Sequence, residues 1–114
     1  MITIYTLKTC DTCKKALKWL DAQGIAYNNI DVRADGMSQE TIKNIVTELG
    51  WEKSLNRRST TWRGLSDAEK AGLDNARAIA LIEAHPTLMK RPVVAIGNQF
   101  FAGFDEATKL ALRA

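Results

Sequence analysis

Two cysteines three positions apart are the residues of this chain best suited to chemistry. Cys10 and Cys13 lie in the stretch YTLKTCDTCKKAL, where an apolar, strand-like run gives way to a basic segment with helical spacing. The thiolate is the reactive form of cysteine, and the unpaired N–H groups and positive dipole end of a helix N-terminus favour it. Cys10 occupies such a position, and Lys14 and Lys15 add positive charge in the first turn. This pattern predicts a redox or nucleophilic role for Cys10.

The same spacing leaves two roles open for the second cysteine. Cys13 shares a helical face with Leu17 and Leu20, so it either resolves a disulfide formed at Cys10 or packs as a small apolar side chain. A structural zinc site generally needs four protein ligands, and beyond the cysteines the chain offers one histidine, His85. Structural disulfides are rare in the cytosol, where we expect this chain. We therefore expect no metal site and no structural disulfide, and favour a C-x-x-C redox motif.

An arginine far from the cysteines in sequence is a candidate for anion binding. Arg91 immediately precedes Pro92 at the start of a predicted strand, and an X-Pro bond is where a cis peptide occurs. Such a turn could bring the Arg91 guanidinium beside the Cys10 thiol, with donors that suit carboxylates and oxyanions. A solvated surface charge is the alternative interpretation, and the residues alone do not decide between them.

Composition and charge narrow the class of protein. The chain has 114 residues, enough for one domain with one core, and 46% of them are hydrophobic. No apolar run reaches the ~20 residues of a membrane helix, and nothing resembles a signal peptide. The net charge is +3, but the basic residues are scattered rather than gathered on one face. We expect a cytoplasmic protein with no membrane association and no direct nucleic-acid binding.

The elements that must position the cysteines follow from changes in hydrophobic period. Residues 2–5 alternate as a strand, apolar residues recur at helical spacing from Asp11 to Gly24, and residues 25–32 predict a second strand. A helix of this length allows a parallel crossover. Residues 1–32 therefore predict a βαβ unit with the cysteines at its first strand-to-helix turn.

Helices are predicted for the middle of the chain. Ser38 can cap a helix that ends at Gly50, and residues 51–65 are rich in loop-forming types. Residues 66–69 match a capping box, and Asp74 can cap a further helix through residue 84.

A hairpin and a last helix are predicted for the end of the chain. Strands at 93–96 and 99–102 flank the turn residues Gly97 and Asn98. The last helix starts at Asp105, and its expected apolar side consists of Ala107, Leu110 and Ala111. The order β-α-β, helical block, β-β-α predicts an α/β domain with a mixed sheet and helices on its faces.

Together these residues resemble the arsenate reductase ArsC superfamily, with its YffB and Spx branches. The resemblance covers nearly the whole chain. The stretch from Trp51 to Arg63 is most similar to the YffB branch. It rests on four ordered motifs: Y-T-x-x-x-C-x-x-C-x-K-A at 5–16, R-S-T-T-W-R-G-L at 58–65, H-P-x-L-x-x-R-P-V-V at 85–94 and G-F-D-E at 103–106. It implies a single domain, 1–114, with a thioredoxin-like fold and a mixed four-stranded sheet. Its core would be 1–35 and 88–114, with a helical insertion at about 36–87.

The resemblance also implies roles for individual residues. Cys10 matches the catalytic cysteine that attacks an oxyanion and is then resolved by glutathione and glutaredoxin. Arg91 matches an active-site arginine with the cis proline after it, and Arg58 matches a second one, with Arg57 as the alternative. Cys13 completes the candidate catalytic set. The expected substrate contacts are Thr9, Asp11, Thr12, Lys14 and Pro92.

Three departures from glutathione-coupled arsenate reductases argue against arsenate as the substrate. This chain has Thr6 where those enzymes have histidine, Cys13 where they have serine, and no arginine at 101–103. Because arsenate is doubly charged near neutrality, losing one of three cationic groups should weaken its binding by ~1.5–3 kcal/mol.

We therefore expect a glutathione-dependent thiol-disulfide oxidoreductase of the ArsC/YffB type, with Cys10 as the nucleophile. No bound cofactor is expected: glutathione is the reductant, glutaredoxin or a protein disulfide is a further partner, and the protein is a monomer. Two alternatives stay open. One is a glutathione- and glutaredoxin-coupled arsenate reductase, and the other is an Spx-like redox-sensing regulator that binds RNA polymerase.

Overall fold

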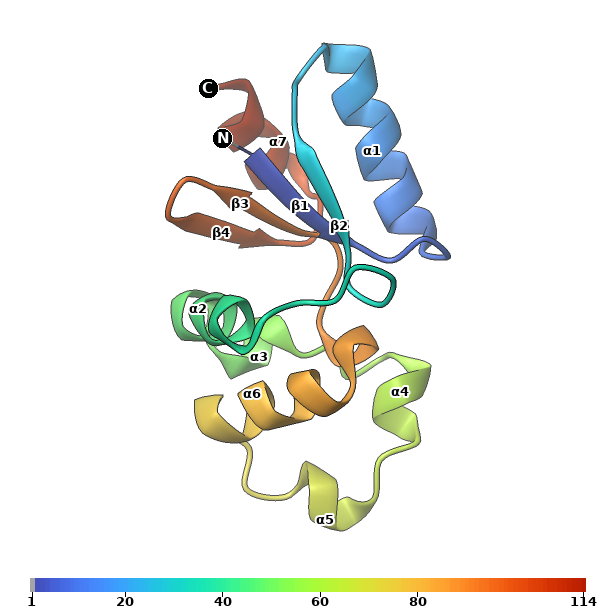
Figure 1. Cartoon of the computed structure of the whole chain (residues 1–114), viewed down its shortest axis with the longest axis vertical. Helices are drawn as coiled ribbons and strands as arrows, with labels where there is room; N and C mark the ends of the chain where they lie inside the picture. Colours follow the sequence, from blue (N-terminus) through green and yellow to red (C-terminus); the bar gives the residue numbers. More distant parts are fainter. Residues whose placement is uncertain (1) are drawn as a thin grey trace.

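A four-stranded mixed sheet lies at the centre of one half of the molecule in the computed structural model, which describes residues 2–114 (Figure 1). The strand order is β2-β1-β3-β4. β1 (Ile2–Thr6) runs parallel to β2 (Asn28–Asp31) and antiparallel to β3 (Val93–Ile96), which pairs antiparallel with β4 (Gln99–Ala102). The predicted thioredoxin-like α/β fold is confirmed.

Two helices cover one face of this sheet. They are α1 (Asp11–Gln23), which follows β1, and α7 (Glu106–Arg113) at the end of the chain (Figure 1). Alternate residues of a strand point to opposite faces, and this helix-covered face receives Ile4 and Val94. Their partners in that buried cluster are Ala16, Leu20 and Leu112. The packing fixes the start of α1, and with it the cysteines, against the sheet.

A helical block lies between β2 and β3 in the chain and packs beyond the other face of the sheet (Figure 1). Tyr5, Val93 and Ala95 point toward this side and join its buried cluster. The block consists of α2 (Gln39–Leu49), α3 (Trp51–Ser54), α4 (Thr60–Arg63), α5 (Asp67–Lys70), α6 (Asn75–Ala84) and the 3-10 turn η1 (Pro86–Leu88). Its end leads directly into the Arg91–Pro92 segment.

The predicted helix caps are confirmed. The Ser38 hydroxyl accepts a hydrogen bond from the Thr41 N–H, and Ser66 forms a reciprocal capping box with Glu69. The Asp74 and Asp105 carboxylates cap α6 and α7 by accepting from the main-chain N–H three residues on. Local side-chain chemistry therefore sets where these helices begin.

The structure corrects three details of the sequence prediction. Residues 51–65, expected to be mainly loop, contain the one-turn helices α3 and α4. The second strand begins only at Asn28. Ala107 and Leu110, expected on the apolar side of the last helix, are exposed, Leu110 to 71%, whereas Thr108 and Leu112 are buried. Burial of Thr108 is tolerated because its hydroxyl donates to the Asp105 carboxylate at 3.1 Å.

Candidate functional site

Cys10 occupies the N-cap position of α1. Its N–H donates to the Leu7 carbonyl at 2.9 Å, and its own carbonyl accepts from the Lys14 N–H at 3.0 Å. Partial burial opposes ionisation of the thiol, but the neighbouring N–H and thiol of Cys13 and the Arg91 guanidinium outweigh it. The pKa of Cys10 is therefore lowered from its ordinary value. This is the environment of a nucleophilic cysteine.

Cys13 lies in the opposite environment. Its side chain is 1% exposed, in the first turn of α1, and both cysteines are free thiols. Burial, reinforced by the adjacent Cys10, raises the pKa of Cys13 to about 12. Cys13 therefore stays a neutral thiol near pH 7 and can donate a hydrogen bond to the Cys10 sulfur. The two sulfurs are chemically different although they stand three positions apart.

Arg91 is held in place by the turn that precedes it. One of its guanidinium nitrogens, Nη1, donates to the main-chain carbonyls of Thr87 and Met89. The peptide bond to Pro92 is cis, and the Pro92 carbonyl accepts from the Gly103 N–H at 2.8 Å. The Nε atom of Arg91 is buried and has no hydrogen-bond partner within residues 2–114. A fixed guanidinium with unused donor capacity beside a thiol is suited to bind a reacting anion.

A cavity of about 430 Å³ opens beside Arg91 and carries most of the positive charge of the site. Its lining residues are Glu52, Leu55, Asn56, Arg57, Arg58, Lys90 and Arg91. Four of these seven carry a positive charge and one carries a negative charge. The arrangement favours anions while keeping one carboxylate at the wall.

Asn56 builds the part of this wall that presents the two neighbouring arginines. Its side-chain oxygen accepts from the Arg58 N–H at 3.1 Å, and its own N–H donates to the Leu88 carbonyl at 2.9 Å. The Arg57 guanidinium lies 5.7 Å from the centre of the Trp51 ring. In the described part of the chain, the Arg58 guanidinium has no hydrogen-bond or ion-pair partner. The turn at Asn56 thus places both arginines at the cavity. The Arg57 guanidinium contacts the Trp51 ring, whereas that of Arg58 has no such contact with the described residues.

The residues predicted from the sequence to contact the substrate do not gather around the arginine cavity. Lys14 and its neighbours Asp11 and Thr12 are exposed on the first turn of α1, and Pro92 is buried. Thr9 is exposed and lines a smaller hollow of about 250 Å³ together with Leu7, Lys8, Asp31, Arg33 and Ala34. None of the five expected contact residues lines the arginine cavity, although Pro92 directly follows Arg91, which does.

Sequence reasoning missed three residues of this region. Asp31, at the end of β2, accepts from the Lys8 N–H at 2.8 Å and so holds the loop that leads to Cys10. Hydrogen bonds from the Ala34 N–H and other main-chain groups lower the pKa of Asp31 despite its partial burial. Lys90 and Glu52 line the arginine cavity. The position of Lys90 next to Arg91 was a usable signal, whereas nothing in the local sequence marked Glu52.

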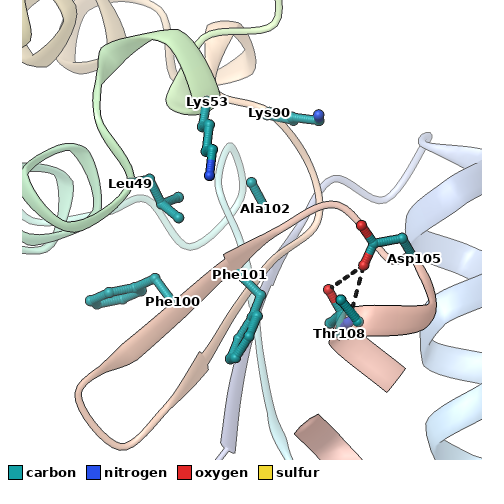
Figure 2. Close-up of a pocket in the computed structure, with 9 residues that line it drawn as sticks. Leu49, Lys53, Lys90, Phe100, Phe101, Ala102, Asp105 and Thr108 are labelled. Atoms are coloured by element: carbon teal, nitrogen blue, oxygen red, sulfur yellow. Dashed lines mark hydrogen bonds between the residues drawn. The ribbon is translucent and has the colours of Figure 1, made fainter. Parts of the chain in front are cut away.

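A second cavity of about 330 Å³ lies where β4 meets α2, α3 and α7 (Figure 2). Phe100, Phe101, Lys53 and Lys90 contribute to its lining. Its only carboxylate, Asp105, is engaged as the α7 cap through Thr108 (Figure 2). Neither cysteine lines either cavity, but this one also lacks Arg91, the residue that acts on the Cys10 thiol, so it is the weaker candidate for a reaction site.

The described residues contain neither a cluster of metal-binding side chains nor a membrane-spanning helix. Across residues 2–114, no group of three or more His, Cys, Asp or Glu side chains is arranged to hold a metal ion. No helix in this range is long and apolar enough to cross a membrane.

Comparisons with known proteins agree with the fold. A model of the ArsC family matches residues 5–112. A solved YFFB protein is 41% identical, with a TM-score of 0.94 and full coverage of both chains. A solved arsenate reductase (ArsC) related protein from Brucella melitensis is 38% identical, with a TM-score of 0.77, covering 96% of this chain and 92% of that one. The global transcriptional regulator Spx of Listeria innocua is 30% identical over 93% of this chain and 82% of its own length.

Proposed function

Because this chain belongs to the ArsC family and has a thiol-oxidoreductase-like fold, we propose that it is a cytoplasmic, glutathione-dependent thiol reductase with Cys10 as its nucleophile. The observation that carries the proposal is the opposite behaviour of the two cysteines. The pKa of Cys10 is lowered by Cys13 and Arg91 against the effect of burial, whereas burial raises the pKa of Cys13 to about 12. One sulfur is prepared to attack and the other is kept protonated.

The first step is attack of the Cys10 thiolate on one sulfur of a disulfide. A bond forms between Cys10 Sγ and that sulfur, the substrate S–S bond breaks, and the other half leaves as a thiolate that takes a proton from solvent. The N-terminus of α1 and the Arg91 guanidinium stabilise the negative charge on Cys10 before attack.

Two molecules of glutathione complete the cycle. The thiolate of the first attacks Cys10 Sγ, expels the bound half of the substrate as a thiolate and leaves glutathione on Cys10. The thiolate of the second attacks the glutathione sulfur, which yields oxidised glutathione and restores the Cys10 thiolate. The net change is reduction of one disulfide to two thiols and oxidation of two glutathione thiols. The groups that lower the pKa of Cys10 also make it a good leaving group in the last step.

Cys13 acts in this scheme as a hydrogen-bond donor to Cys10 and not as the resolving thiol. Burial is the largest cause of its raised pKa, and burial persists when Cys10 is part of a mixed disulfide. Its thiolate fraction near pH 7 is therefore very small, and external glutathione resolves the intermediate instead.

Thiol trapping tests the proposal. Wild type, Cys10→Ser and Cys13→Ser are incubated with oxidised glutathione and measured by intact mass. Wild type and Cys13→Ser are expected to carry one glutathione adduct, and Cys10→Ser none. An adduct on Cys10→Ser would overturn Cys10 as the nucleophile. A wild type that loses two hydrogens without an adduct would show that Cys13 resolves.

Relatedness to Spx makes a redox-sensing regulator the second candidate. A sensor of this kind would switch by forming a disulfide between Cys10 and Cys13, and the burial of Cys13 opposes that step. A pull-down with the RNA polymerase α subunit, under oxidising and under reducing conditions, separates the two candidates. We expect no retention in either condition.

A further inference from the structure

Glu52 is the one carboxylate in the wall of the arginine cavity, and its side chain is exposed. The cavity also contains Arg57, Arg58, Lys90 and Arg91. Within residues 2–114 the Glu52 carboxylate forms no ion pair with any of them. Because Glu52, Arg57, Arg58 and Lys90 are exposed, their charges stay solvated and are available to a ligand.

The wall of the cavity is held together by main-chain hydrogen bonds, and two of its cations contact groups outside the cavity. The Lys90 N–H donates to the Ser54 carbonyl at 2.8 Å, which ties α3 to the segment that contains Arg91. Arg57 lies over the Trp51 ring, and Arg91 donates to main-chain carbonyls. These contacts direct Arg57 and Arg91, whereas the exposed Glu52, Arg58 and Lys90 side chains remain free to meet a ligand.

Opposite charges kept apart in one cavity define the chemistry of a ligand. An inorganic oxyanion would pair with the arginines but be repelled by Glu52, and a simple cation would be repelled by the four basic side chains. A ligand that has an ammonium group and carboxylates satisfies both. An α-amino-acid end carries an ammonium and a carboxylate on the same carbon, and 430 Å³ is within the usual range for a small-molecule pocket.

The cavity is also connected to the nucleophile. Arg91 lines it and at the same time lies close enough to Cys10 to lower the pKa of that thiol, although burial acts in the opposite sense. Cys10 does not itself line the cavity, so a thiol whose amino-acid end is bound there would reach Cys10 past Arg91.

We propose that this cavity binds the γ-glutamyl end of glutathione, with Glu52 accepting from its ammonium group and Arg58 donating to its carboxylate. The inference rests on the proposed glutathione-dependent function and makes Glu52 the residue that determines specificity for an amino-acid thiol. Arg57 and Lys90 supply the surplus positive charge that suits the second carboxylate of the peptide.

Binding of S-methylglutathione, which has no free thiol, tests this inference without any reaction at Cys10. Its affinity is measured by calorimetric or NMR titration against the analogue in which the γ-glutamyl ammonium is replaced by hydrogen. Wild type is expected to bind S-methylglutathione about tenfold more tightly than the analogue, as for one charge-assisted contact at an exposed site. In Glu52→Gln this preference should fall to about one, because the variant binds S-methylglutathione more weakly and no longer repels the analogue.

Glu83→Gln is the matched control, since Glu83 is an exposed carboxylate on α6 that does not line the cavity. It should keep the tenfold preference. Unchanged thermal unfolding of Glu52→Gln would confirm that the exposed side chain can be changed without loss of the fold. Equal affinity of wild type for the two ligands, no binding of either, or an unchanged preference in Glu52→Gln would overturn the inference.

The two proposals fail in different ways. If Cys10 forms the glutathione adduct in the trapping experiment but the two ligands bind equally, only the Glu52 subsite is wrong. If the ligands are discriminated but no adduct forms at Cys10, only the reductase is wrong.

Discussion

The two parts of the candidate site are built in different ways. Cys10 and Cys13 differ because one lies at a helix end and the other on the buried face of the same first turn. The cationic cavity instead joins residues 52–58 to residues 90–91, and depends on contacts between the helical block and the segment before β3. Arg91 alone belongs to both parts. The comparison teaches that reactivity of the nucleophile is mainly local, whereas recognition of the ligand depends on tertiary docking.

Removing the nucleophile should produce the largest effect. Cys10→Ser is expected to lower the rate of glutathione-dependent disulfide reduction by more than about 10³-fold, because the only low-pKa sulfur is lost. A coupled assay of oxidised glutathione measures it. Cys13→Ser is the matched control and should retain most of the activity. Comparable losses in both variants would contradict the division of roles between the two sulfurs.

Changing the residue shared by both parts should have the next largest effect. Arg91→Ala is expected to lower the reduction rate about 10–100-fold and to raise the pKa of Cys10, since the charge that opposes burial is removed. The pH dependence of Cys10 alkylation by iodoacetamide measures that pKa. In wild type the rate should rise with pH at a midpoint below 9.0, the ordinary value for the thiol, and in the variant the midpoint should move to higher pH.

Arg91→Lys separates charge from geometry. It keeps the positive charge but loses the planar donor set, so an intermediate midpoint is expected. An alkylation profile that stays the same in both variants would show that Arg91 does not act on the thiol.

Burial of Cys13 should appear in the pH dependence of stability. Its pKa is raised from 9.0 to about 12 on folding, mainly by burial, so the folded state is favoured below pH 9 and loses this contribution between pH 9 and 12. Tyr5 and Tyr27 also have raised pKa values, chiefly through burial, and act in the same direction. The informative quantity is therefore the difference between wild type and a variant.

Cys13→Ala is the variant that isolates this contribution. It should cost ~1 kcal/mol of unfolding free energy near pH 7, as for loss of a small buried side chain. Its stability should fall less steeply than that of wild type from pH 9 to 12, as measured by urea unfolding. Parallel curves would mean that Cys13 ionises in the folded protein as easily as in the unfolded chain.

The smallest effects are expected from the two neighbouring arginines of the cavity. Arg58→Ala should weaken S-methylglutathione binding about 3–10-fold and leave thermal stability unchanged, because its guanidinium lacks a partner within residues 2–114. Arg57→Ala should have the smaller effect on binding and lose ~0.5–1 kcal/mol of stability, since it lies over the Trp51 ring. The opposite result would assign the ligand contact to Arg57.

Much of the fold could be predicted because its signals are local. The strand at Ile2–Thr6 and the helix at Asp11–Gln23 follow from hydrophobic period, and the caps at Ser38 and Asp105 follow from side-chain chemistry. The predicted apolar side of the last helix was wrong, because Leu110 is exposed and Thr108 is buried instead. The Thr108 hydroxyl is hydrogen-bonded, which makes its burial possible. Hydrophobicity alone does not reveal that kind of compensation.

The candidate site likewise combines features set by the local sequence with features set by tertiary contacts. The sequence by itself determined that Cys10 stands at a helix N-terminus and that Cys13 lies on the apolar face one turn on, because both follow from the 3.6-residue period. Only the tertiary structure decided that Arg91 lies against the thiol, that Arg57 and Arg58 line one cavity with it, and that Glu52 completes the wall. Those positions depend on hydrogen bonds between the Ser54–Asn56 and Leu88–Lys90 segments, which no local pattern specifies.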